Sequence, residues 1–138
     1  MNGTKEVQLK MHLKGVPLFC NLNDGQISVL SRVSVITPFK KGRIIVHQKD
    51  SGDTFYIVVS GRVKVTLLNE DGREIVLSIL TKGDFFGELA LLDNEPRSAN
   101  VIAVEDTGLF LITRAQFYQL IETHPHILRK VLKEICAR

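Results

Sequence analysis

Cysteine is scarce in this chain, and long apolar runs are missing. The 138 residues include two cysteines, Cys20 and Cys136, near opposite ends. A disulfide framework or a zinc site needs more ligands at closer spacing. The sequence contains no run of about 18 apolar residues, the length needed to cross a membrane. Residues 1–6 also lack the apolar core of a signal peptide. We therefore expect a cytoplasmic protein without membrane contact.

Signatures of catalysis are missing as well. Neither GxxxxGK[ST] nor GxGxxG occurs, which argues against triphosphate hydrolysis and dinucleotide binding. None of the four histidines stands at a recognisable spacing from a nucleophile. His124 and His126 flank Pro125, but two ligands seldom suffice to hold a metal. The sequence thus predicts a protein that is not an enzyme and that has neither a metal nor a cofactor.

The charge balance gives little support for nucleic-acid binding. The net charge is +3, and the densest basic group is Lys40, Lys41 and Arg43. Such a small patch is more typical of a solvated strand end than of a DNA-binding surface. No DNA contact is expected from this chain itself.

Hydrophobic periodicity divides the chain into helical ends and a β-rich middle. Residues 7–33 are predicted to form short helices, with Asn23 and Asp24 as the N-cap of a helix that carries Ile27 and Leu30. From residue 35 the apolar period changes to about 2, and turn residues recur every eight to twelve positions or so, which is typical of an antiparallel sandwich or barrel. Strands are predicted over 35–39, 43–48, 54–59, 62–69, 73–80, 100–104 and 108–112.

Two local signals refine this outline. The Asp71-Gly72 pair lies between two alternating runs and predicts a tight hairpin with a primed turn. Thr113 is predicted to cap a helix that extends to Glu122, and a last helix should run from Pro125 to the end of the chain. No stop signal closes that helix, so we expect a truncated segment. The chain is interpreted as one domain, with a β-rich part at 35–113 and C-terminal helices at 114–138.

The stretch 87–99 interrupts the regular strand pattern. It begins with Gly87 and Glu88, continues through an apolar helical turn, and ends with Pro96-Arg97-Ser98. Amides at the start of a helical turn attract anions, and an arginine can hold a phosphate with two hydrogen bonds. A carboxylate would accept from a sugar hydroxyl. From the residues alone, a connecting loop with a Glu88–Arg97 surface ion pair is an equally good interpretation.

Longer segments resemble a known family. The run Gly83-Asp84-Phe85-Phe86-Gly87-Glu88-Leu89-Ala90-Leu91-Leu92, followed by Pro96-Arg97-Ser98-Ala99-Asn100-Val101, resembles the phosphate-binding cassette (residues 86–99) of cyclic nucleotide-binding domains. Residues 56–65 resemble the preceding strand pair, and residues 13–19 the N-terminal helix of bacterial Crp/Fnr-type regulators. The resemblance spans about 13–137. It implies a mainly β fold, an eight-stranded antiparallel β-roll (double-stranded β-helix or jelly roll) flanked by N-terminal helices and the start of a C-terminal helix.

The resemblance also implies a ligand and three side-chain roles. Arg97 would bind a cyclic phosphate, Glu88 would bind the ribose 2′-hydroxyl, and Ser98 would assist through its hydroxyl. Serine at position 98 is similar to bacterial cAMP receptors, whereas cGMP-selective sites often have threonine there. The implied ligand is therefore cAMP, with cGMP as the less favoured choice.

Further contacts follow from the same resemblance. Gly87, Leu89 and Ala90 would contribute mainly backbone groups at the helix start. Val65 and Leu77, on the two central strands, would line the purine side of the pocket.

The family pattern suggests a role in signalling. In bacterial relatives the C-terminal helix forms a dimer seam, and a DNA-binding domain follows it. Here only the start of that helix is present, so a homodimer is conceivable, and DNA contact would require a domain that this chain lacks. The expected function is a cAMP-sensing module of a transcriptional regulator. The alternatives are a nucleotide-free β-roll that mediates interaction or sensing, and, with less support, a phosphodiesterase.

Overall fold

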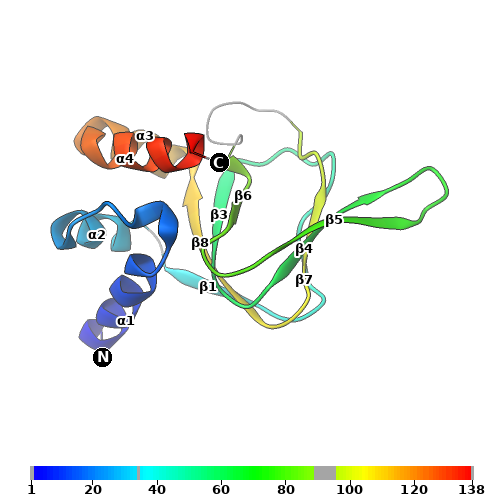
Figure 1. The fold of residues 1–138 in the computed structure, drawn as a ribbon, viewed down its shortest axis with the longest axis horizontal. Helices are drawn as coiled ribbons and strands as arrows, with labels where there is room; N and C mark the ends of the chain where they lie inside the picture. The colour runs from blue at the N-terminus through cyan, green and yellow to red at the C-terminus, as the bar shows by residue number, and fades with distance from the viewer. Residues whose placement is uncertain (1, 34, 89–95, 138) are drawn as a thin grey trace.

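A two-sheet β-roll with helices along one side makes up the structure, a computed structural model that describes residues 2–33, 35–88 and 96–137 (Figure 1). All strand pairs are antiparallel, and the described strands form two four-stranded sheets, ordered β1-β8-β3-β6 and β2-β7-β4-β5. This confirms the predicted fold class. The strands are β1 (Ile36–Phe39), β2 (Ile44–Val46), β3 (Thr54–Ser60), β4 (Val63–Leu68), β5 (Glu74–Leu80), β6 (Phe85–Phe86), β7 (Asn100–Ala103) and β8 (Thr107–Thr113).

Helices α2 and α3 begin where the sequence predicts caps. Asn23 and Gln26 form a reciprocal capping box at the start of one helix, and Thr113 and Gln116 form another. Each box satisfies two backbone donors that the first helical turn would otherwise leave unpaired. The helical elements are α1 (Asn2–Lys14), the 3₁₀ turn η1 (Pro17–Phe19), α2 (Asp24–Ser31), α3 (Arg114–Thr123) and α4 (Pro125–Cys136). Within the described residues, no helix is both long and apolar enough to span a membrane.

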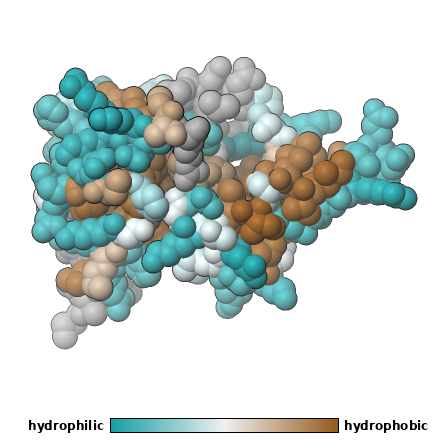
Figure 2. Space-filling view, in the orientation of Figure 1, coloured by the Kyte–Doolittle hydropathy of each residue, from teal (hydrophilic) through white to brown (hydrophobic). Residues whose placement is uncertain are grey.

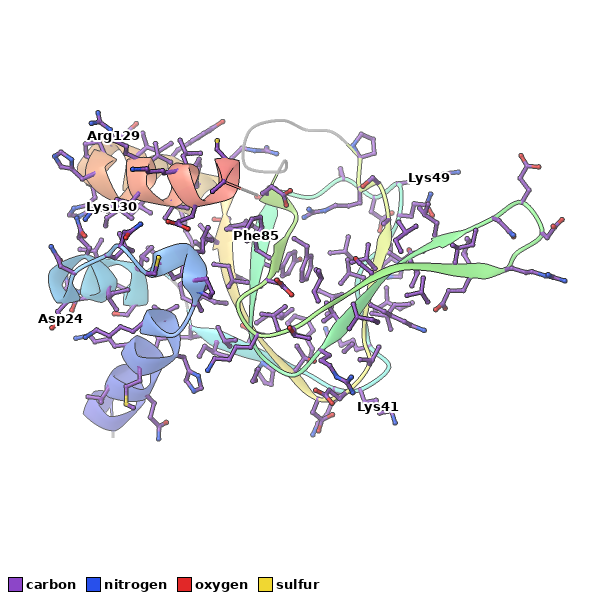
Figure 3. The ribbon with its side chains drawn as sticks, viewed as in Figure 1. Asp24, Lys41, Lys49, Phe85, Arg129 and Lys130 are labelled. Carbon is purple, nitrogen blue, oxygen red and sulfur yellow. The ribbon has the colours of Figure 1, made fainter. Side chains whose placement is uncertain are left out.

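The buried side chains form two clusters on opposite faces of the first sheet. One joins that sheet to the helices and includes Phe19, Phe55 and Phe110. Across these helices, Lys130 of α4 points toward α2 and donates to the carbonyl of Asn21 at 2.9 Å (Figure 3). The other cluster lies between the two sheets and comprises Val46, Val58, Val63, Phe86, Val101 and Leu109.

The β4–β5 hairpin is confirmed, but its turn differs from the prediction. Gly72 has a φ of 78°, and it is the only residue of the turn with positive φ. Its amide donates to the carbonyl of Asn69, and the Asn69 side chain accepts from Asp71 and Arg73 amides at 3.0 and 2.8 Å. A primed turn would need positive φ at Asp71 too. The connection is instead a three-residue loop closed by a glycine in the left-handed region.

An extra residue interrupts the pairing of β4 and β5. Val65 pairs with Ser78, whereas the next residue, Thr66, pairs with Val76. Leu77 is therefore left without a partner on β4, which is the arrangement of a β-bulge. A bulge changes which side chains face the interior, because the alternation along a strand has a period of two.

The outer part of this hairpin exposes apolar side chains. It projects from the roll, and Figure 2 shows a hydrophobic patch over its base. The large apolar residues that remain 45–57% exposed on the two strands are Leu68, Ile75, Val76, Leu77 and Ile79.

Candidate functional site

A cavity of about 520 Å³ opens between the second sheet and the segment that follows β6. This volume is within the range of small-molecule sites, about 300–1,000 Å³. Its apolar wall comes from the inter-sheet cluster and its neighbours, and its charged groups, Glu88 and Arg97, come from the two ends of the stretch 87–99. The lining residues are Val46, Val65, Ser78, Leu80, Phe85, Phe86, Gly87, Glu88, Pro96, Arg97, Ser98, Ala99 and Val101.

The backbone of Arg97 is fixed to the loop between β2 and β3. Its amide donates to the carbonyl of Asp50, and its carbonyl accepts from the amide of Lys49, each at 2.8 Å. Strand β7 begins only at Asn100, as predicted, so Arg97 and Ser98 lie in the segment that precedes it. These two hydrogen bonds hold the segment in place nevertheless.

The side chain of Arg97 is held as firmly as its backbone. Nη2 donates to the carbonyl of Thr54 at 2.8 Å, and the guanidinium carbon lies 5.9 Å from the centre of the Tyr56 ring. The Tyr56 ring in turn stacks on Phe86, with 4.7 Å between ring centres and 9° between planes. A cation over an aromatic face is attracted by the negative charge of that face. The half-buried guanidinium therefore has a defined position at the cavity wall.

Gly87 is required by this arrangement. Its φ is 79°, in the left-handed region that favours glycine. A Cβ on Gly87 would lie 2.7 Å from Nη1 of Arg97 and 2.8 Å from the carbonyl oxygen of Thr54. The space that a side chain at this position would fill is therefore occupied by the arginine and by the Thr54 carbonyl.

The ionisation of Tyr56 reflects the same surroundings. Burial raises the pKa of Tyr56 above its ordinary value of 10.0. The positive charge of Arg97 lowers the pKa and the negative charge of Asp53 raises it, but both effects are smaller than that of burial. The phenol is therefore neutral at physiological pH, and it presents an uncharged ring to the guanidinium.

Glu88 and Ser98 also lie on the cavity wall, Glu88 half-buried and Ser98 exposed. Across the described part of the chain, the ion pairs do not include one between Glu88 and Arg97. The interpretation of these residues as a surface ion pair is therefore not supported. A carboxylate, a hydroxyl and a fixed guanidinium face one space.

Of the two residues predicted for the purine side of the pocket, only one lies at the cavity, because of the β-bulge. Val65 lines the cavity. Leu77 does not: it is 53% exposed on the hairpin, and Ser78, the partner of Val65, lines the cavity instead. Leu89 and Ala90, with the helical turn expected after Glu88, lie outside the described residues. Phe86 and Val101 also line the cavity but were not predicted as binding residues, because their only signal is an apolar side chain within a β-rich segment.

The arrangement suits a small ligand with an anionic group, hydroxyls and a flat apolar part. Arg97 offers charge-assisted donors, Glu88 offers an acceptor, and the valine and phenylalanine wall offers an apolar surface. In the part of the chain that the structure describes, no group of three or more His, Cys, Asp or Glu side chains is placed to hold a metal. A β-roll with such a pocket defines a class of ligand-binding modules.

Comparison with known sequences identifies the family. The family model of the cyclic nucleotide-binding domain matches residues 36–124, more than half of the chain. The chain therefore belongs to the cyclic nucleotide-binding domain family. It is 32% identical to the cyclic AMP receptor protein of Thermus thermophilus over 91% of its own length, and 39% identical to a cGMP-dependent protein kinase of Toxoplasma gondii over 91%. The chain spans 58% of that receptor protein and 12% of that kinase.

Solved structures show the same likeness. The N-terminal domain of a transcriptional regulator from Streptomyces coelicolor A3(2) superimposes with a TM-score of 0.80 at 28% identity, covering 92% of this chain and 89% of that one. The catabolite activator protein of Thermus thermophilus gives 0.78 at 32% identity, covering 88% and 57%. The regulatory domain of Toxoplasma gondii PKA with cAMP gives 0.70 at 30%, covering 84% and 44%.

Proposed function

We propose that this chain binds cAMP in the 520 Å³ cavity, with the cyclic phosphate on Arg97. The observation that carries the proposal is the fixed guanidinium, held by the Thr54 carbonyl and the Tyr56 ring at the cavity wall. A cation already in position loses little freedom when an anion arrives, so binding costs less. Glu88 accepts from the ribose 2′-hydroxyl, and Ser98 donates its hydroxyl to the phosphate.

The purine occupies the apolar end of the cavity, against Val65 and its neighbours. Ser78 replaces Leu77 in this assignment, because it is the residue opposite Val65 that lines the cavity. Backbone contacts from Gly87, Leu89 and Ala90 remain part of the proposal.

The preference for cAMP over cGMP rests on Ser98 and on the relatives whose names include cAMP. The cGMP-dependent kinases among the relatives make cGMP the competing ligand. Competitive titration of both nucleotides decides between them. A tighter dissociation constant for cGMP would reverse the assignment.

Titration calorimetry with an arginine variant tests the site. We expect Arg97→Ala to weaken cAMP binding by about 2–5 kcal/mol, because a largely desolvated phosphate loses its charge partner. This corresponds to about 30- to 5,000-fold in the dissociation constant. Arg43→Ala is the matched control, since Arg43 also lies over a ring, 5.2 Å from the centre of Phe39, but outside the cavity. Equal affinity of wild type and Arg97→Ala would rule out this site.

We also propose that the chain is a sensory, non-catalytic module of a transcriptional regulator. The receptor and regulator relatives support this role. Ligand binding would be transmitted to α4, which lies beside the roll in Figure 1. Two copies of the chain would form a homodimer through this helix. DNA binding would belong to another domain.

Sedimentation with and without cAMP tests self-association. Chromatography for AMP after long incubation with cAMP would reveal an unexpected hydrolase.

A further inference from the structure

The space beside the Arg97 guanidinium depends on a second glycine, Gly52, in the loop before β3. A Cβ on Gly52 would lie 2.7 Å from Nη2, 2.8 Å from Nε and 3.1 Å from the guanidinium carbon of Arg97. Non-bonded carbon contacts are optimal at about 3.5–4.0 Å, so a methyl group cannot share this space with the arginine. The three atoms nearest to that Cβ all belong to Arg97.

We propose that Gly52 is a positioning residue for phosphate capture, because its missing side chain leaves the slot that holds the Arg97 guanidinium. The inference rests on the proposed function. Gly87 closes the slot near Nη1, and the carbonyl of Thr54 accepts from Nη2. The slot is thus formed by two glycines from separate loops and one backbone acceptor.

The loop that carries Gly52 cannot easily move aside. On one side of it, Lys49 and Asp50 form the two backbone hydrogen bonds with Arg97. On the other side, the Asp53 carbonyl accepts from the amide of Arg114 at 2.8 Å, where β8 passes into α3. Because both flanks are tied, an added methyl group would displace the guanidinium from the Tyr56 ring and from the Thr54 carbonyl. A displaced cation would meet the phosphate in the wrong position.

Gly52 is a cleaner probe of the slot than Gly87. Gly87 has a positive φ, so any substitution there also strains the backbone. Gly52 is not among the glycines with positive φ, and alanine can adopt its backbone conformation. Without the arginine, Gly52→Ala should even stabilise the fold, because alanine has fewer unfolded conformations than glycine. The effect of this one substitution should therefore reverse its sign when Arg97 is removed.

Two measurements on the 138-residue chain test the proposal. Calorimetry with cAMP and cGMP should show that Gly52→Ala raises the dissociation constant of the bound nucleotide by about tenfold or more. Melting temperatures of the ligand-free proteins should fall for Gly52→Ala in the wild-type background but stay equal or rise in the Arg97→Ala background. Gly25→Ala, in α2 and away from the cavity, is the matched glycine control and should bind like wild type.

The outcomes separate the two proposals. Wild-type affinity of Gly52→Ala, or an equal loss of melting temperature in both backgrounds, would show that Gly52 does not act through Arg97. If the wild type bound neither cAMP nor cGMP, the proposed function would fail, and the role in phosphate capture with it. The melting temperatures would still show whether Arg97 occupies the slot. Weaker binding together with the reversed stability effect supports the positioning role.

Discussion

Lys49 allows a strict test of the loop that fixes Arg97. Its φ is 75°, and among the described residues it is the only one other than glycine with positive φ. A residue with a side chain loses about 1–2 kcal/mol of folding stability when its backbone adopts the left-handed region. Glycine removes that cost but loses about 0.5–1 kcal/mol through the larger entropy of the unfolded chain. We therefore expect Lys49→Gly to stabilise the protein by about 0.5–1 kcal/mol.

Only the side chain of Lys49 changes in this variant. It lies at the periphery of the roll (Figure 3), and the hydrogen bond to the Arg97 carbonyl comes from its amide, which glycine keeps. Binding of cAMP should therefore stay at the wild-type level. For a chain of this length, the expected gain raises the melting temperature by about 2–3 °C.

Chemical denaturation and thermal melting provide the assay, and Lys82→Gly is the control. Lys82 lies in another exposed turn and does not have a positive φ. There the same substitution should destabilise the protein by about 0.5–1 kcal/mol, since only the entropy cost remains. If Lys49→Gly destabilised the protein as much as Lys82→Gly does, the left-handed conformation and the account of this loop would be refuted.

Two further predictions concern the cavity wall and the ring beneath the arginine. Leu77→Ala should leave the cAMP dissociation constant within about twofold, whereas Val65→Ala should weaken binding by about 1 kcal/mol through lost apolar contact; calorimetry that ranked them in the reverse order would contradict the bulge. Because burial raises the pKa of Tyr56, the folded state holds the phenolic proton more tightly than the unfolded state does. The resulting contribution to folding stability is complete below pH 10.0 and is lost as the pH rises through the pKa of the folded state. Denaturation from pH 9 to 11 should therefore show a fall in stability that Tyr56→Phe reduces; an equal fall in Tyr56→Phe and in the wild type would disprove this assignment.

Local chemistry explains which parts of the fold could be predicted. The capping residues Asn23 and Thr113 act within one helical turn, so their role can be inferred from neighbouring residues. Strand β6 was not predicted, because two residues are too short to show a period. It exists because Tyr56 and Ile57 of β3 pair with Phe86 and Phe85.

The candidate site shows the same division between local and long-range features. Their chemistry and the resemblance were enough to place Arg97 and Glu88 together at one site, and both line the cavity. The bulge that exchanges Leu77 for Ser78 depends on pairing between strands, and no residue in the segment signals it. The slot at Gly52 could not be predicted from the sequence either, because it forms only where the loop before β3 packs against the segment before β7.

A crystal structure of the chain with bound cAMP would test the central claim most directly. The account predicts that the cyclic phosphate lies within hydrogen-bond distance, about 2.7–3.2 Å, of the Arg97 guanidinium, with the 2′-hydroxyl at Glu88 and the purine against Val65. The guanidinium should keep its place beside Gly52 and over Tyr56. A nucleotide bound elsewhere, or a phosphate that does not contact Arg97, would contradict the account.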